Sequence, residues 1–196
     1  MSKRVKISNY LKNENKDKFL INNVFVEKNH VPDFYFSDNM DFDLPAKNRS
    51  IHLVTNRSFN AIEIIEKIVK KEEIIKSAIA VYSINKRATE KIISLAKEGK
   101  IKEAIFLFST IRNDRGENLE ACYKKLEDSK LFKIGYYYTH AKIMAIETHQ
   151  NNYVIEMSCN LANNARIENI TIFNDKDLFE FHSMCITNLV KLYNNV

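Results

Sequence analysis

Four polar side chains with complementary chemistry stand within two apolar stretches in the last third of the sequence. His140 and Lys142 are two residues apart, and so are Ser158 and Asn160. Because side chains alternate between the two faces of a strand, each pair shares one face if both stretches are extended. Two adjacent strands would then present a nucleophile or base, a fixed cation and two neutral hydrogen-bond donors. Such a set suits a tetrahedral anion such as a phosphodiester, whose charge must be met by positioned donors.

These residues carry a resemblance to a known superfamily. The stretch His140–Lys142, four further residues and the acid Glu147, followed by Ser158–Asn160, resembles the HxKx4D…(G)SxN signature of the phospholipase D-like superfamily. The next segment, Leu161–Glu168, is similar to the family segment that ends in a functional glutamate. The upstream order of strands and helices is also compatible from Ile51 onward. An HxK pair alone would be a weak signal, but the pair with the acid, the SxN and the trailing glutamate is a specific one.

Two positions depart from the family pattern. Glu147 replaces the aspartate of the signature and keeps its charge. In the family this acid lies outside the phosphate pocket, and its odd spacing from Lys142 also puts it on the opposite face of a regular strand. Met157 replaces the glycine before the serine, so a larger side chain stands beside the expected pocket.

The resemblance implies both a mechanism and an assembly. Family members catalyse with two signatures and this chain has one, which implies a homodimer with its active site across the two-fold axis. His140 would attack phosphorus to give a phosphohistidine, while the partner's His140 would protonate the leaving oxygen and then activate water. Lys142, Asn160 and Ser158 would bind the phosphoryl oxygens, and Glu168 would orient His140. No metal or other cofactor is implied.

We therefore expect a metal-independent phosphodiesterase, and in particular a nuclease acting on DNA or RNA, because short single-signature members are typically nucleases. A different hypothesis is a catalytically weak or inactive phospholipase D-like module that binds nucleic acid or a protein partner. Glu147 and Met157 are the two residues that favour it. A phospholipid or another small phosphodiester is a third candidate substrate.

Other residues have weaker functional interpretations. Arg112 follows an expected strand at the carboxyl edge of the sheet, where ligands often bind, so it is a candidate for substrate binding or simply part of a solvated loop. The run Gly135–Tyr138 could stack on bases or pack in the core. The remaining histidines lack metal-ligand spacing and are expected in surface or packing positions; they are His30, His52, His149 and His182.

The elements that must position these residues alternate along the chain. Apolar patterning predicts strands at Ile51–Thr55, Ser77–Ile84, Ala104–Thr110, Phe132–Tyr138, His140–Glu147, Tyr153–Asn160 and Ile170–Phe173. Helical spacing predicts helices over Phe59–Val69, Lys86–Glu98 (ended by Gly99), Glu117–Asp128 and Lys176–Tyr193. This order predicts an α/β fold in which helices flank a mixed β-sheet, here a phospholipase D-like α-β-α sandwich over residues 51–196. Residues 1–50 are expected to form a peripheral N-terminal arm with two short strands, one around Phe19–Val26.

Composition sets wider limits. The 196 residues, 45% of them hydrophobic, suffice for one domain with a proper core. The net charge of +5 is compatible with a phosphate-bearing partner such as nucleic acid. The three cysteines form no ligand or disulfide pattern, and no apolar stretch approaches the roughly 20 residues of a membrane helix, so we expect a cytoplasmic protein without a membrane segment. The heavy use of Lys, Asn and Ile is typical of an AT-rich genome, such as that of a phage or mobile element.

Overall fold

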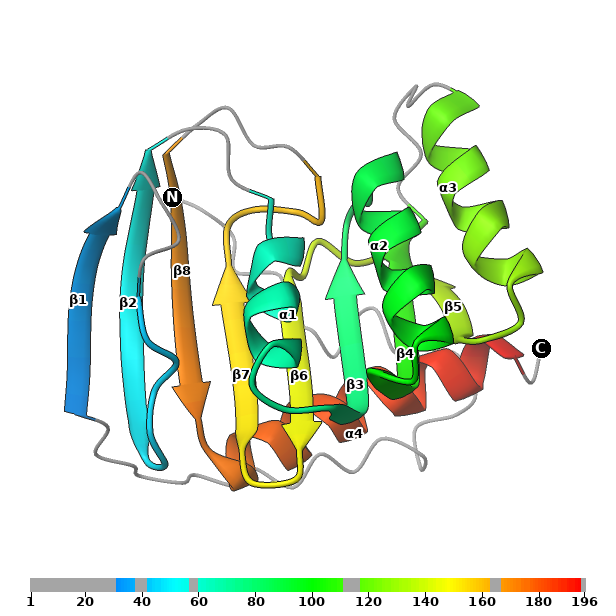
Figure 1. Ribbon diagram of the computed structural model, residues 1–196. Coiled ribbons are helices and arrows are strands. Elements are labelled where there is room, and N and C mark those ends of the chain that lie inside the picture. Colours follow the sequence, from blue (N-terminus) through cyan, green and yellow to red (C-terminus); the bar gives the residue numbers. More distant parts are fainter. Residues whose placement is uncertain (1–30, 38–41, 57–59, 111–116, 163–166, 195–196) are drawn as a thin grey trace, which may run out of the picture.

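The computed structural model describes residues 31–37, 42–56, 60–110, 117–162 and 167–194, which contain eight strands and four helices (Figure 1). The strands are β1 (Val31–Ser37), β2 (Arg49–Asn56), β3 (Ile74–Val81), β4 (Ile101–Ser109), β5 (Lys133–Tyr137), β6 (Ile143–Thr148), β7 (Asn152–Met157) and β8 (Ile167–Asn174). The helices are α1 (Ile62–Val69), α2 (Lys86–Lys97), α3 (Glu117–Asp128) and α4 (Lys176–Asn194).

The strands form one mixed sheet in the order β1-β2-β8-β7-β6-β3-β4-β5. Strands β3, β4 and β5 run parallel to one another, whereas β3, β6, β7, β8 and β2 alternate in direction. As a result, the end of β3, the start of β6, the end of β7 and the start of β8 all lie at the same edge of the sheet. This edge receives the residues of the candidate site.

Helices cover both faces of the sheet, with α1, α2 and α3 on one side and α4 on the other (Figure 1). The side chains of β6 alternate between two apolar cores: Met144 and Ile146 belong to the larger core with α1, α2 and α3, while Ala145 packs with Phe179 and Val190 of α4. The expected α-β-α sandwich is therefore confirmed, and so is the two-sided burial expected for β3 and β4.

Local signals explain how the chain enters the second helix. The Asn85 side chain caps α2, its Oδ1 accepting from the Ala88 backbone N–H at 2.9 Å. Gly99 follows the helix with a φ of 73°, a conformation that glycine adopts without steric cost. Strand β3 ends at Val81 rather than at the expected Ile84, because the residues after Val81 leave the ladder to reach this cap; Ile84 instead bridges Leu161.

At the N-terminal side, β1 extends the sheet as a parallel neighbour of β2, and Arg49 pairs with Asp33 at 3.1 Å. The expected boundary after residue 50 thus falls inside β2, and the second half of the expected arm contributes an edge strand. The strand expected around Phe19–Val26 lies outside the described residues. Within the described part of the chain, no helix is long and apolar enough to cross a membrane.

Candidate active site

The expected site residues come together at the sheet edge described above, but just beyond the strands. His140 and Lys142 precede β6, and Ser158 and Asn160 follow β7, so the strands expected over His140–Glu147 and Tyr153–Asn160 are each shorter at this edge. The Ala141 backbone N–H donates to the Thr139 hydroxyl at 3.1 Å, a local turn that takes the place of a ladder bond. The placement therefore comes from strand ends meeting at one edge, and not from alternation along two long strands.

The backbone holds the two segments against each other. The Met157 N–H donates to the Lys142 carbonyl at 3.1 Å, and the Ser158 N–H donates to the Asn169 carbonyl at 2.9 Å. Further along, the Asn85 N–H donates to the Leu161 carbonyl at 2.9 Å. The site residues are thus carried on loops anchored to β6, β8 and the start of α2.

His140 and Lys142 form one contact group. The Lys142 ammonium lies 3.2 Å from His140 Nδ1 and donates to the His140 carbonyl at 3.3 Å. Because an ammonium only donates, Nδ1 is the acceptor in this arrangement, and a neutral ring then carries its proton on Nε2. His140 is exposed.

A tyrosine that the sequence had placed in a buried strand completes this group. The ring of Tyr82, just past the end of β3, lies 5.0 Å from the His140 ring, and the Lys142 ammonium lies 5.9 Å from the Tyr82 ring centre. Tyr82 is buried. Its ring contacts both the imidazole and the ammonium. Its position at the carboxyl end of a parallel strand is a signal in the sequence that could have identified it.

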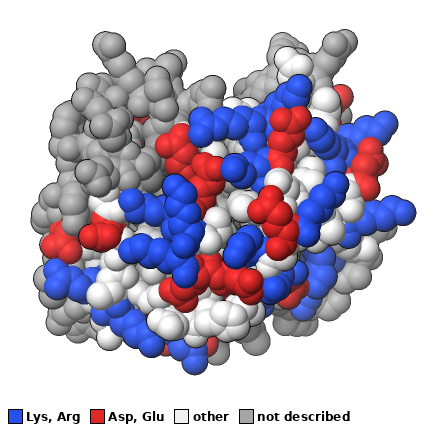
Figure 2. All heavy atoms as spheres, in the orientation of Figure 1, with Lys and Arg blue, Asp and Glu red and all other residues white. Residues whose placement is uncertain are grey.

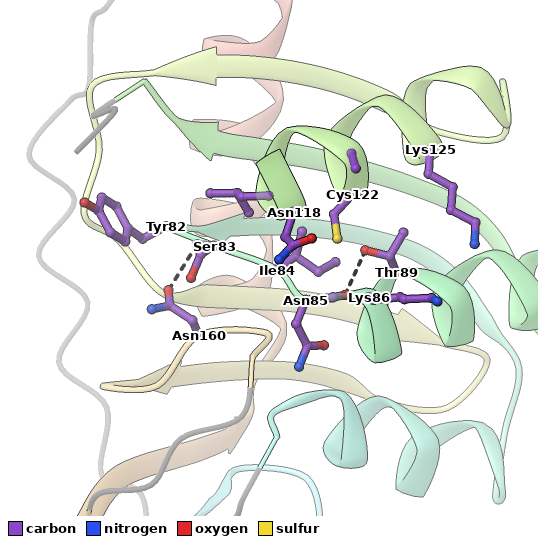
Figure 3. Close-up of a pocket in the computed structure, with 12 residues that line it drawn as sticks. Tyr82, Ser83, Ile84, Asn85, Lys86, Thr89, Asn118, Cys122, Lys125 and Asn160 are labelled. Carbon is purple, nitrogen blue, oxygen red and sulfur yellow. Dashed lines mark hydrogen bonds between the residues drawn. The ribbon is translucent and has the colours of Figure 1, made fainter. Parts of the chain in front are cut away.

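Asn160 is hydrogen-bonded to the backbone of Ser83, the residue after Tyr82. Its Oδ1 accepts from the Ser83 backbone N–H at 3.3 Å (Figure 3). A backbone N–H can face only the oxygen of a carboxamide, so the Nδ2 group lies on the other side of the amide. That donor is suited to a phosphoryl oxygen.

Ser158 and Glu168 form the second contact group. The Ser158 hydroxyl donates to the Glu168 carboxylate and accepts from the Asn169 backbone N–H at 2.9 Å. Within the described structure, Glu168 therefore bonds Ser158, while Nδ1 of His140 faces Lys142. The role expected for Glu168, orientation of His140, remains a prediction.

Cys159, between the two signature residues, is buried and has its own electrostatics. Burial and, to a smaller extent, the nearby Glu168 carboxylate raise the pKa of its thiol, Lys142 lowers it, and the net result is a pKa of about 12. A thiol with this pKa stays protonated at neutral pH, so Cys159 is a packing residue and not a nucleophile.

The other candidates lie elsewhere or cannot be placed. Glu147 is at the opposite end of β6 from His140, in register with Lys76 and Asn152. Arg112 and His30 lie outside the described residues. His149 is exposed at the turn between β6 and β7.

Two further histidines have structural contacts. His52 lies 3.2 Å from the Thr171 hydroxyl, and His182 pairs with Glu156 at 3.2 Å. In the described ranges, no group of three His, Cys, Asp or Glu side chains could hold a metal ion.

Charge on the face of α1, α2 and α3 is mixed and not uniformly basic (Figure 2). Lys and Arg side chains there alternate with carboxylates, in ion pairs that link α1 to α2 and α2 to α3: Arg87–Glu63, Lys91–Glu66 and Lys125–Glu90. Among the described residues of this face, basic side chains are therefore interspersed with acidic ones.

Comparison with known proteins supports the fold. The chain is similar to a solved structure of Nuc from Salmonella typhimurium, a phospholipase D family member, with 16% sequence identity and a TM-score of 0.55 over 72% of this chain and 96% of that one. Weaker similarities connect it to phosphatidylserine synthase from Haemophilus influenzae (13% identity, TM-score 0.48, 74% of this chain and 39% of that one) and polyphosphate kinase from Porphyromonas gingivalis (11%, 0.49, 68% and 24%). No protein-family model and no curated protein matches the sequence. The chain has a phospholipase D-like fold.

Proposed function

We propose that this protein is a metal-independent phosphodiesterase, a nuclease that cleaves DNA or RNA through a phosphohistidine at a site shared by two copies of the chain. The observation that carries the proposal is the placement of exposed His140, with Lys142 on its ring, at the sheet edge where Ser158, Asn160 and Glu168 also lie. The fold supports it, because it is the fold of a phospholipase D family member.

The contacts of His140 suggest how substrate would activate it. For Nε2 to attack phosphorus, the ring proton must sit on Nδ1, which in the unliganded arrangement faces the Lys142 ammonium. A bound phosphoryl group draws Lys142 to its own oxygens and so releases Nδ1. The Nδ1–H then needs an acceptor, and Glu168 is the carboxylate at this edge that can become one.

The proposed reaction has two steps. Nε2 of His140 forms a bond to phosphorus as the bond to the leaving oxygen breaks, and the partner's His140 gives that oxygen a proton. The partner's His140 then takes a proton from water, whose oxygen displaces Nε2 from phosphorus and restores the enzyme. Lys142 and the Asn160 Nδ2 group hold the non-bridging oxygens during both steps.

A cleavage assay in EDTA tests the chemistry. Plasmid DNA, single-stranded DNA and RNA should each be offered to the wild type, to His140→Ala and to His149→Ala. His149 is the matched control, since it is an exposed histidine at the opposite end of β6. We expect cleavage to survive chelation, to fall by at least about a thousandfold in His140→Ala and to persist in His149→Ala. Loss of cleavage on chelation, or full activity in His140→Ala, refutes the proposal.

Subunit mixing tests the shared site. If each reaction needs the histidines of both copies, a heterodimer of wild type and His140→Ala is inactive. After subunit exchange, activity should therefore follow the square of the wild-type fraction. Activity that follows the fraction linearly would show that each chain works alone.

Two observations favour the binding-module alternative. The Ser158 hydroxyl is already engaged with Glu168 and Asn169, and Met157 packs against the core beside it. Crystals soaked in vanadate or tungstate distinguish the two functions. An analogue bonded to His140 supports catalysis, whereas a site that takes up no analogue, in a protein that still binds nucleic acid, supports the module.

A further inference from the structure

An open groove of about 830 Å³ adjoins the candidate active site and extends between α2 and α3 (Figure 3). Tyr82, Ser83 and Asn160 line it at the end next to the site, and Lys86 and Lys125 line it at the other end. Tyr82 also contacts the His140 ring, and Asn160 belongs to the candidate site. A substrate whose phosphodiester lies at His140 would therefore extend directly into this groove.

The groove is lined by both apolar and polar side chains. Leu119 and Cys122 of α3 present apolar surface, and Asn118 and Asn160 present carboxamides, whereas the Asn85 side chain is turned toward the start of α2, which it caps. The described residues that line the groove include no aspartate or glutamate, although the Lys125 ammonium is paired with the Glu90 carboxylate at 2.8 Å. An anionic ligand can therefore enter without meeting a carboxylate on the groove wall.

A nucleotide matches this combination. A base has an apolar face and an edge of hydrogen-bond donors and acceptors, and carboxamides pair with such edges. The groove volume lies within the range of small-molecule sites, which extends from about 300 to about 1,000 Å³. A lipid chain would instead bring hydrocarbon against the carboxamides of Asn118 and Asn160 and the two ammonium groups.

We infer that this groove binds the nucleotide next to the scissile phosphate, with its base between α2 and α3. The inference rests on the proposed function, because only a phosphodiester held at His140 positions that nucleotide. It assigns a specificity role to Asn118, an exposed residue of α3 that lies outside the family signature.

A variant that fills the groove without removing a core residue tests the inference. Ala121 is exposed on α3 and lines the groove, so Ala121→Trp should obstruct it while the protein still folds. Lys124→Trp is the matched control, since Lys124 is exposed on the same helix and does not line the groove. This control is stringent, because it also removes a positive charge.

Two substrates separate the groove from the chemistry. Methyl p-nitrophenyl phosphate has no base, whereas thymidine 5′-(p-nitrophenyl phosphate) has one. We expect Ala121→Trp to raise KM for the thymidine ester by at least about tenfold, roughly the effect of losing one stacked base, and to leave the methyl ester within about twofold. Lys124→Trp should change neither. Equal effects of Ala121→Trp on both esters, or no effect on either, overturn the inference and leave the proposed function intact.

If the protein cleaves neither ester, that result counts against the proposed function, and the groove is then tested by measuring binding. Calorimetry on the His140→Ala protein compares thymidine 5′-monophosphate with inorganic phosphate. The groove is supported, even without cleavage, if the nucleotide binds more tightly than phosphate and if Ala121→Trp abolishes this difference. Equal affinity for the two ligands overturns the inference.

Discussion

Replacement of Asn160 should separate its structural contact from its function. The Oδ1 atom accepts from the Ser83 N–H at 3.3 Å, and the Nδ2 group is the proposed phosphoryl donor. Asn160→Asp keeps an acceptor for Ser83 but places a negative charge where the donor was. Asn160→Ala removes both groups. We therefore expect the alanine variant to be the less stable of the two and the aspartate variant to be the less active.

The magnitudes follow from these contacts. Asn160→Ala leaves a partly buried N–H without its partner, which costs about 1–2 kcal/mol. In a chain of this size, that lowers the melting temperature by about 2–8 °C. In Asn160→Asp, a carboxylate about 4 Å from a phosphate would repel it by roughly 4 kcal/mol at an effective dielectric constant of 20. Because Asn160 is half-buried, we take about half of this, which corresponds to a loss of roughly 30-fold in substrate affinity.

Thermal unfolding without ligand and hydrolysis of methyl p-nitrophenyl phosphate measure the two effects separately. The alanine variant should melt below the wild type, and the aspartate variant close to it. Hydrolysis should fall further in the aspartate variant than in the alanine variant. An aspartate variant that melts as low as the alanine variant would refute the hydrogen-bond assignment, and one with wild-type hydrolysis would refute the role of Asn160 toward phosphate.

Two further predictions concern stability. In Gly135→Ala, the new Cβ would lie 2.9 Å from the Val190 Cα, so β5 and α4 must separate. We expect the free energy of unfolding to fall by about 1–3 kcal/mol and the melting temperature to fall by about 2–12 °C. An unchanged melting temperature would show that α4 does not pack on β5 as described. A hydrogen bond from His182 lowers the pKa of Glu156 below its ordinary 4.5, so this contact stabilises the fold above pH 4.5 and is lost as the pH falls through the lowered pKa. Glu156→Gln should therefore be less stable than the wild type near pH 6, by under about 1 kcal/mol because the Glu156 side chain is about half exposed. The difference should become smaller as the pH falls below 4.5. Urea unfolding over this pH range checks this, and a difference that does not decrease contradicts it.

Helices and the overall α/β class could be predicted because their signals are local. The expected bounds Glu117–Asp128 match α3, and the helix expected over Lys86–Glu98 and ended by Gly99 agrees with α2 to within one residue. The ends of β3, β6 and β7 could not be predicted in the same way. Continuous apolar runs do not show where a ladder stops, because that depends on which neighbouring strand is still present to bond.

The candidate site shows the same division. His140, Lys142, Ser158 and Asn160 could be found because their types and spacing are unusual within apolar stretches. For Tyr82, the sequence signal was limited to its place at the carboxyl end of a strand, because its contact with His140 joins positions 58 residues apart and depends on β3 and β6 lying side by side. The bond between Ser158 and Glu168 depends in turn on the register of β7 against β8.

The charge distribution determines how such a site could select its substrate. The chain has a net charge of +5, but the cations of Arg87, Lys91 and Lys125 are paired with carboxylates of neighbouring helices. Long-range attraction to a phosphate backbone is therefore weak on this face, and exposed ion pairs are screened at physiological salt. Under the proposed function, affinity would then come from the donors beside His140 and from the groove between α2 and α3. Under the proposed function, one or two nucleotides of a substrate would contact these groups at the site and in the groove.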